Sequence, residues 1–184
     1  SELNIIVLTG GLSAERNVAL ASGKSVAKAL REAGNNVRVI DPIYGIAQPD
    51  EEKIFMDRPA IGKEFPTAEE LNLYSNRKVI ECINSDLFDN TDIVFLALHG
   101  KFGEDGRIQS LLELRGVKYT GTGVTSSAMA MDKNISKIMF KQHDISTPKW
   151  FMLKKGNQTE LQVDENIKLQ VGYPAVIKPN DEGS

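Results

Sequence analysis

A pair of glycines, Gly10 and Gly11, is followed closely by Glu15, an arrangement typical of a ligand-binding turn. Residues 3–9 are strand-like and residues 14–33 show helical spacing, so the glycines join a strand to the start of a helix. Free backbone N–H groups at such a turn can bind an anion. Glu15 has two interpretations: it offsets the dipole of the helix, or it faces a cleft and binds a substrate ammonium.

His99 stands between an apolar run at residues 93–98 and a glycine-rich loop that contains Glu104 and Asp105. The run predicts a central strand buried on both faces, and residues 107–115 predict a helix. His99 is therefore expected at the carboxyl end of a strand, where open α/β sheets bind their ligands. It either orients a carboxylate or shares a proton, or it is a hydrogen-bonded loop histidine beside two solvated acids.

Two lysines and the last residues of the chain have the chemistry to hold phosphate groups. Lys133 lies near the start of a helical pattern, and Lys178 ends an apolar run at residues 175–178. Lysines that converge from a helix and a strand can hold nucleotide phosphates as point charges, although isolated lysines are ordinarily solvated. Residues 182–184 begin a small-residue loop whose backbone N–H groups could wrap phosphates.

The sequence lacks the motifs of several other chemistries. Residues 121–123 contain two glycines but not the third glycine of the dinucleotide fingerprint, so a Rossmann dehydrogenase is disfavoured. Neither a Walker A motif nor a Gly-x-Ser-x-Gly nucleophile elbow is present. No second histidine or cysteine stands at metal-ligand spacing from His99, so no metal site is expected within this chain.

The composition narrows the class of protein. The chain has 184 residues, of which 41% are hydrophobic and 26% charged, as in an ordinary globular protein. Its formal net charge of -3 disfavours nucleic acid as a partner, and no apolar run is long enough to suggest a membrane partner. Cys82 is the only cysteine, which excludes an intrachain disulfide and fits a reducing, cytoplasmic setting.

Alternating strands and helices must position these candidate residues, and they predict an α/β fold with a mostly parallel sheet. Strands are expected at residues 3–9, 37–40, 93–98 and 117–119, and helices at residues 14–33, 107–115 and 125–143, the last with a break near Met131. Residues 43–90 predict short strands, turns and a helix.

The character of the chain changes after Asp144. Strands are expected at residues 149–153 and 175–178, and a short helix at residues 164–169. No later element is available to cover or pair with the last of these strands. We therefore expect a second domain that is incomplete in this chain.

Together, these stretches resemble the D-alanine–D-alanine ligase family of the ATP-grasp superfamily. Five segments carry the resemblance, in the family's order and at compatible spacings: residues 8–16, 97–106, 119–123, 130–133 and 178–184. The combination of Ser-Ala-Glu-Arg with His-Gly and Gly-Glu-Asp-Gly is highly specific. The resemblance implies a Rossmann-like (pre-ATP-grasp) substrate-binding domain over residues 1–122. It also implies the start of a truncated α+β ATP-grasp central domain over residues 123–184.

The resemblance also implies a reaction. ATP phosphorylates the carboxylate of one D-alanine, and the amine of a second D-alanine attacks the acyl phosphate to form the dipeptide used in peptidoglycan. Glu15 would hold the ammonium of the first D-alanine, and Ser184 would bond to Glu15 and position it, which makes both catalytic candidates. His99 would lie near the carboxylate of that D-alanine. The implied ATP-binding residues are Lys133, Lys178, Glu182, Gly183 and Ser184.

Further expectations come from the same resemblance. Magnesium or manganese would assist the ATP chemistry, with ligands beyond residue 184, and the protein would be a cytoplasmic homodimer. We expect this chain alone not to complete the reaction. Two alternatives stay open: a D-alanine–D-lactate or D-alanine–D-serine ligase, whose second-substrate choice would lie beyond residue 184, and a non-catalytic nucleotide- or amino-acid-binding module.

Overall fold

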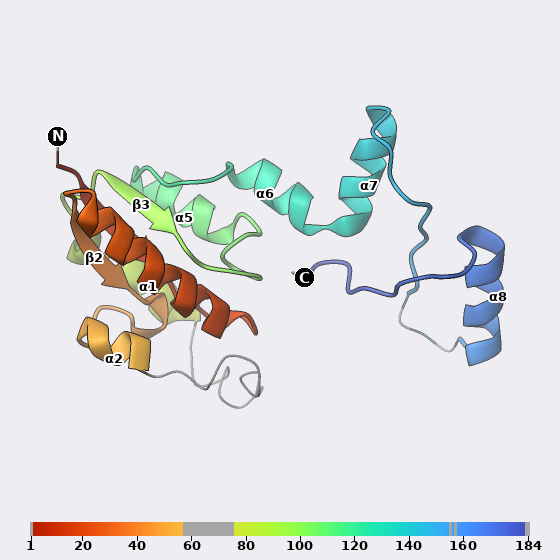
Figure 1. Ribbon diagram of the computed structural model, residues 1–184, viewed down its shortest axis with the longest axis horizontal. Coiled ribbons are helices and arrows are strands. Elements are labelled where there is room, and N and C mark those ends of the chain that lie inside the picture. The colour runs from red at the N-terminus through yellow and green to blue at the C-terminus, as the bar shows by residue number, and fades with distance from the viewer. Residues whose placement is uncertain (1, 57–75, 155, 157, 183–184) are drawn as a thin grey trace. The chain divides into compact units, whose positions relative to one another are not determined.

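A computed structural model of the protein describes residues 2–56, 76–154, 156 and 158–182, and it shows an α/β fold (Figure 1). The chain divides into two compact units, of which the first reaches Ala128 and the second runs from Met129 to Glu182. The division falls within helix α6 (Val124–Met131). The domain boundary expected after residue 122 stays a prediction.

The first unit is built on a parallel sheet of three strands, β1 (Asn4–Leu8), β2 (Asn36–Ile40) and β3 (Ile93–Leu96), in the order β2-β1-β3. Strand β1 lies between β2 and β3, and β3 in turn lies between β1 and the segment at Tyr119. The strand predicted at residues 93–98 is therefore internal to the pairing, as β1 is, although it ends at Leu96. Tyr119 extends the pairing beyond β3 through a single parallel bridge to Val94.

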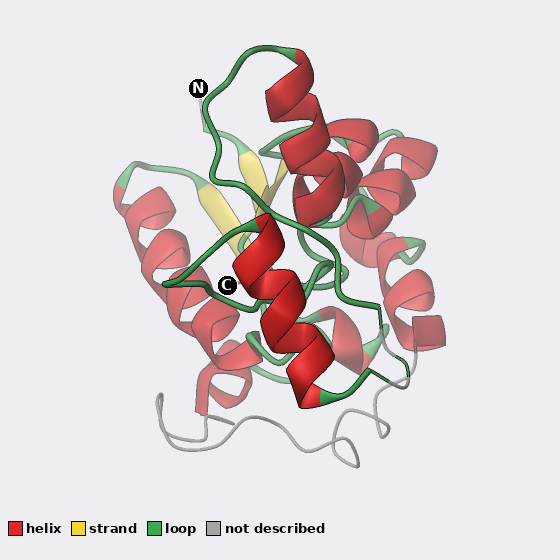
Figure 2. Ribbon diagram, turned by 90° about the vertical axis from the view of Figure 1, so that its right-hand side faces the viewer, coloured by secondary structure: helices red, strands yellow, loops and turns green. Residues whose placement is uncertain are grey.

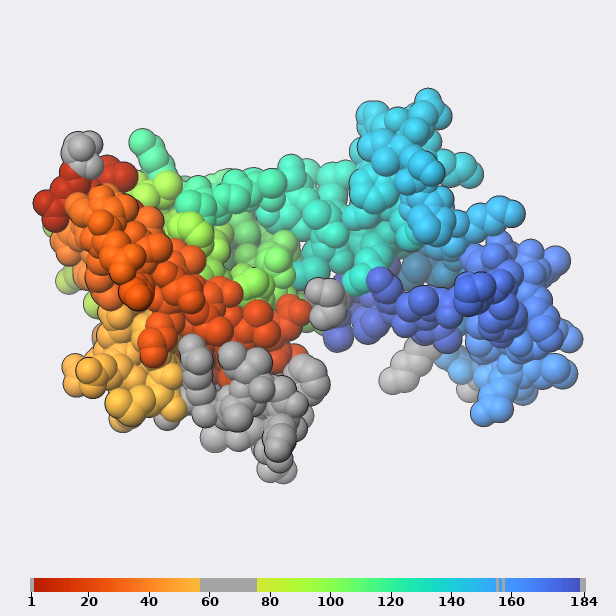
Figure 3. Space-filling model, in the orientation of Figure 1, coloured from red at the N-terminus to blue at the C-terminus, as the bar shows by residue number. Residues whose placement is uncertain are grey.

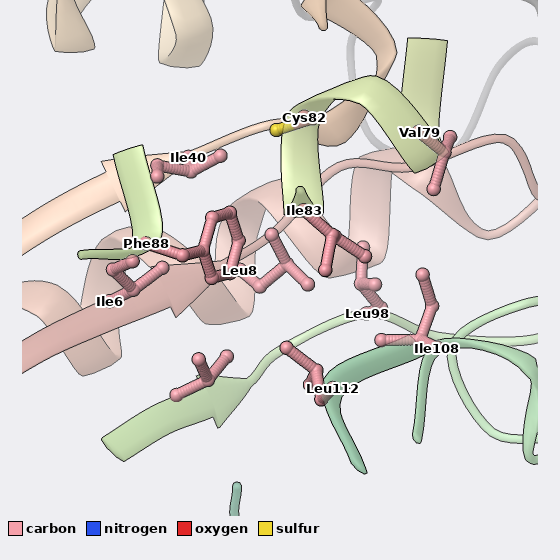
Figure 4. Close-up of a cluster of buried hydrophobic side chains, with 11 residues drawn as sticks. Ile6, Leu8, Ile40, Val79, Cys82, Ile83, Phe88, Leu98, Ile108 and Leu112 are labelled. Carbon is pink, nitrogen blue, oxygen red and sulfur yellow. The ribbon is translucent and has the colours of Figure 1, made fainter. Parts of the chain in front are cut away.

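Both faces of the sheet are covered by helices because the apolar side chains of β1 alternate between them. Ile5 and Val7 pack on one side, and Ile6 and Leu8 on the other. The first face is covered by α1 (Arg16–Glu32) and α2 (Glu51–Met56), which lie next to each other in Figure 3. The second face is covered by α4 (Asn76–Ile83), the short helix η2 (Asp86–Phe88) and α5 (Arg107–Arg115), whose buried side chains appear in Figure 4.

The ends of these helices follow from local chemistry. Helix α5 has the predicted bounds and stops at Gly116, whose φ of 77° is left-handed and suits glycine at a helix end. The described part of residues 43–90 contains α2, α4, η2 and the short helix η1 (Pro42–Tyr44) but none of the predicted strands. The rest of that segment, residues 57–75, lies outside the described residues.

The second unit contains the end of α6 together with α7 (Lys133–Gln142) and α8 (Glu160–Gln170). The predicted break near Met131 is confirmed, because Asp132 caps α7 by accepting a 2.8 Å hydrogen bond from the backbone N–H of Ile135. Helix α8 begins with a capping box in which Thr159 and Gln162 bond to each other's backbone N–H.

The strands predicted at residues 149–153 and 175–178 do not form in the described part of the second unit. In Figure 2, α8 faces the viewer, and the described segments on either side of it are loops. Val176 and Ile177 are 79% and 70% exposed. A strand is stabilised by pairing and by packing on its faces, and residues 175–178 have neither here.

Candidate functional site

The candidate residues of the first unit gather at one edge of its sheet. Because all three strands are parallel, their carboxyl ends meet there: Gly10 and Gly11 follow β1, Asp41 follows β2 and His99 follows β3. The connection through α1 carries the chain from β1 to β2, whereas β3 lies on the other side of β1. The strand order therefore reverses between β1 and β3, and such switch points are where open α/β sheets bind ligands.

Glu15 occupies the N-cap of α1 and not its first turn. Its carboxylate makes no capping hydrogen bond, and no acidic residue lies in the first turn of the helix. The side chain is half-buried, and its backbone N–H donates to Ser13 Oγ at 3.1 Å. The carboxylate is therefore not engaged by the N–H groups of its own helix, which favours the ligand interpretation of Glu15 over the helix-dipole interpretation.

His99 is held from two directions by serines of the first βα connection and its helix. Its ring Nε2 lies 3.2 Å from Ser22 Oγ on α1, and its backbone carbonyl accepts a 2.5 Å hydrogen bond from Ser13 Oγ. The imidazole is half-buried. These contacts fix the backbone of His99 beside the start of α1 and its ring beside Ser22, further along the same helix.

Gly100 lets the two loops meet. Its φ of 71° is left-handed, and a Cβ atom at this position would lie 2.7 Å from Glu15 Oε2 and 3.1 Å from Ser13 Oγ. Only a residue without a side chain fits between them. The structure thus brings the Glu15 carboxylate and the His99 loop together, as the sequence analysis expected.

Glu104 and Asp105 hold the loop that follows His99. Glu104 Oε2 accepts a 2.7 Å hydrogen bond from the backbone N–H of Gly100, and Asp105 Oδ2 accepts a 2.9 Å hydrogen bond from that of Phe102. Asp105 also pairs with Arg107 at 3.0 Å. Glu104 is exposed, as the solvated-acid interpretation expects, whereas Asp105 is largely buried, and both carboxylates also satisfy backbone donors of the loop.

Leu98 packs against both the turn that contains Gly11 and the loop that contains Gly103. It is 6% exposed and belongs to the cluster shown in Figure 4, next to Ile83 and Ile108. A Cβ atom on Gly11 would lie 2.9 Å from Leu98 Cδ2, and one on Gly103 would lie 2.5 Å from Leu98 Cβ. Both glycine turns therefore pack directly against Leu98.

In the second unit, the start of α7 is joined to the last described residues. The backbone N–H groups of Lys133 and Asn134 donate to Asn180 O and Asn180 Oδ1 at 2.9 and 3.0 Å, and Lys133 Nζ donates to the carbonyl of Glu182. Lys178 is exposed and lies in the same segment. Lys133 and Glu182 are thus brought together, whereas Gly183 and Ser184 lie outside the described residues.

The described residues hold neither a cluster of metal ligands nor a membrane-spanning helix. Among those residues, no three or more His, Cys, Asp or Glu side chains are grouped to hold a metal ion. None of the described helices is long and apolar enough to cross a membrane.

Sequence reasoning missed several residues that shape these sites. Ser13 and Ser22 contact His99 across 86 and 77 positions, and Asn180 reaches Asn134 across 46. Two of them left a signal: Ser13 begins the Ser-Ala-Glu-Arg stretch, and Ser22 lies seven residues after Glu15 and so on the same face of a helix. The other contacts depend on long-range packing that spacing does not reveal.

Comparison with known proteins places this geometry in a family. A family model described as "D-ala D-ala ligase N-terminus" matches residues 4–122. A D-alanine–D-alanine ligase from Wolbachia sp. subsp. Brugia malayi is 38% identical over 99% of this chain and 41% of its own length. One from Geobacter sulfurreducens is 36% identical over 97% of this chain and 43% of its own length. The chain thus spans less than half the length of these curated relatives.

Solved structures of D-alanine–D-alanine ligases also match this chain. The crystal structure of the ligase from Bacillus anthracis matches 99% of this chain and 47% of its own, with a TM-score of 0.65 and 30% identity. A structure of the Bacillus anthracis ligase complexed with ATP matches 98% of this chain and 48% of its own, with a TM-score of 0.62 and 27% identity. Because the family model matches more than half of this chain, the chain belongs to the D-ala D-ala ligase N-terminus family.

Proposed function

We propose that this chain is the N-terminal part of an ATP-dependent D-alanine–D-alanine ligase that makes D-alanyl-D-alanine for peptidoglycan. The relatives that bear this name match nearly the whole chain, at 38% and 36% identity. The observation that carries the proposal is the meeting of Glu15 with the His99 loop at Gly100, on the carboxyl edge of the sheet. A carboxylate beside a loop that carries a histidine suits a zwitterionic amino acid, whose ammonium and carboxylate need opposite partners.

In the proposed reaction, ATP phosphorylates the carboxylate of the first D-alanine, and the amine of the second displaces phosphate from the acyl phosphate. Glu15 accepts hydrogen bonds from the ammonium of the first D-alanine, and His99 lies beside its carboxylate. These contacts hold the acceptor oxygen in place for phosphoryl transfer, which depends mainly on positioning and charge stabilisation.

The proposed ATP contacts lie in the second unit. Lys133 and Lys178 bind the phosphates as point charges, and residues 182–184 contact the nucleotide, with Ser184 also bonded to Glu15. In support, Lys133 already lies beside the backbone of Glu182, and a matching Bacillus anthracis ligase is complexed with ATP.

The proposal also includes a cytoplasmic homodimer and a domain boundary after residue 122. Magnesium or manganese would offset charge on the transferring phosphoryl group. The described residues do not offer a grouped set of metal ligands, so no step is derived through the metal.

The test is Glu15→Gln in the full-length ligase of which this chain would be the N-terminal part. Loss of a charge-assisted hydrogen bond should raise KM for the first D-alanine by about 10- to 100-fold. The free energy of unfolding should change little, because the carboxylate makes no capping bond. Steady-state kinetics and urea unfolding measure the two quantities.

The matched control is Glu32→Gln at the other end of α1. Among the described residues, Glu32 forms one exposed 3.7 Å pair, with Lys28. The KM of the Glu32→Gln enzyme for the first D-alanine should therefore equal that of the unmodified enzyme. An unchanged KM in Glu15→Gln would remove Glu15 from the substrate site.

A further inference from the structure

A buried ion pair lies directly beneath the glycine turn. Arg16, the first residue of α1, places Nη1 2.6 Å from Oδ2 of Asp41, which follows β2. The two side chains are 7% and 0% exposed. Burial raises the pKa of the Asp41 carboxyl, and the charge of Arg16 opposes that rise.

The pair of Arg16 and Asp41 forms hydrogen bonds to both the N–H and the carbonyl of Gly11. The backbone N–H of Gly11 donates to Asp41 Oδ1 at 3.1 Å, and Arg16 Nη1 donates to the carbonyl of Gly11 at 3.2 Å. Asp41 Oδ1 also accepts from the backbone N–H of Ile43 at 3.3 Å. Both hydrogen-bonding groups of Gly11 are therefore fixed by the same two charged side chains.

Gly10 shows how closely the turn wraps around the pair. Its φ is 74°, and a Cβ atom there would lie 2.3 Å from Asp41 Oδ2 and 2.7 Å from Arg16 Nη1. The pair thus sets the path of the backbone between β1 and α1.

That path leads directly to the candidate site. Ser13, two residues after Gly11, donates to the carbonyl of His99 and accepts from the backbone N–H of Glu15. From this continuous set of contacts we propose that Arg16 and Asp41 are positioning residues, which hold the 10–15 turn so that Glu15 faces His99. Neither side chain is placed in contact with a substrate.

A role in positioning explains why the pair is charged. Buried ion pairs are poor stabilisers, because the desolvation of two charges offsets much of their attraction. A pair of apolar side chains could fill the same volume, but it could not bind the N–H and the carbonyl of Gly11 together. The local geometry of the turn is what the charges supply.

The test compares two double neutralisations in this chain. Arg16→Met with Asp41→Leu removes the pair and both of its hydrogen bonds to Gly11 without leaving one buried charge unpaired. Arg31→Gln with Glu51→Gln removes a 2.6 Å pair that joins α1 to α2 and whose side chains are 41% and 37% exposed. Amide hydrogen exchange is measured by NMR at Gly11 and Glu15 and across β1.

Loss of the positioning pair should speed exchange at Gly11 and Glu15 by about ten-fold while β1 stays protected, and the control should leave both regions unchanged. Equal acceleration throughout β1 would show a pair that acts only on global stability, and would overturn the inference. So would unchanged exchange at Gly11 and Glu15. If the double variant does not fold, Arg16→Lys, which keeps the charges but not the fork of donors, decides between the same outcomes.

A second readout rests on the proposed function. In an NMR titration of the Glu15 amide with D-alanine, the positioning variant should bind about ten-fold more weakly, and the control should bind as the unmodified chain does. If the unmodified chain does not bind D-alanine, the proposed role of Glu15 fails, whereas the positioning inference is still decided by the exchange data. Equal D-alanine affinity in both variants would overturn the inference.

Discussion

The two units hold their candidate residues in different ways. In the first unit, Glu15 and His99 project from loops that rest on a sheet covered on both faces. In the second unit, Ile167 is the one large apolar side chain among the described residues that is buried, and Lys133 is held by hydrogen bonds to the backbone of the 180–182 segment. Several apolar side chains there are exposed: Ile135, Ile138, Phe140, Ile145, Met152, Leu161, Leu169, Val176 and Ile177.

The candidate residues of the two units are therefore fixed by different kinds of contact. The geometry of the first unit is determined by a packed core, so it should resist surface changes and respond strongly to core changes. The geometry of the second unit depends on polar contacts, each of which contributes only about 1 kcal/mol.

The largest effect is expected from Leu98→Ala. This change deletes a buried side chain that supports both glycine turns, and it should lower the free energy of unfolding by about 2–5 kcal/mol. Ile138→Ala in the second unit is the control, because Ile138 is 50% exposed and should change the value by less than about 1 kcal/mol. Urea unfolding measures the free energy of unfolding of both variants. Equal losses in the two variants would contradict the proposed difference between the units.

A smaller effect is expected from Gly100→Ala. The left-handed backbone should cost about 1–2 kcal/mol, and the added Cβ would also press on Glu15 Oε2. Gly34→Ala isolates the first contribution, since Gly34 has a φ of 84° and nothing within 4 Å of the added atom. Gly100→Ala should therefore destabilise the protein more than Gly34→Ala. Equal unfolding free energies for the two variants would mean that the two loops do not press together.

The smallest effect is a pH dependence in the first unit. Burial, aided by the charge of Asp41, raises the pKa of the Cys82 thiol from 9.0 to about 12. Because the unfolded chain then loses its thiol proton at lower pH than the folded chain, stability is retained below pH 9 and falls as pH rises towards 12. The fall contributed by Cys82 should be about 1 kcal/mol between pH 9 and pH 10.

Cys82→Ala is the control for this pH dependence. It should flatten the slope only in part, because the pKa of Tyr119 is also raised to about 12 by its hydrogen bond to Glu113. Urea unfolding at each pH provides the measurement. An identical slope in Cys82→Ala and in the unmodified chain would contradict the assignment to the thiol.

Much of the first unit was predictable because its signals are local. The run from Ile93 is apolar enough to indicate a strand, and Gly116 marks the end of α5 as expected. The strand order was not predictable, because the sequence pattern of a buried strand does not reveal which strands lie beside it. The strands expected at residues 149–153 and 175–178 failed for a related reason: strand formation depends on partners that composition does not reveal.

The residues of the candidate site that carry the chemistry were predictable from the sequence, whereas the residues that hold them in place were not. Glu15 and His99 stand out by type and by place at strand ends. Ser13 and Arg16 belong to the Ser-Ala-Glu-Arg stretch, but their contacts with His99 and Asp41 became visible only in the structure, because they join distant segments. Their side chains are common types whose role depends on which loop they touch.

The sheet order has a consequence for folding. Strand β1 pairs with β2 through a short connection, whereas its pairing with β3 joins Ile5 to Ile93 and closes a much longer loop. A ligand that contacts both Glu15 and His99 binds only chains in which that longer loop is closed. By mass action, such a ligand at about 100 times its Kd would stabilise the closed state by about 2.7 kcal/mol. An amino acid bound at this edge would therefore shift the folding equilibrium of the first unit towards the native state.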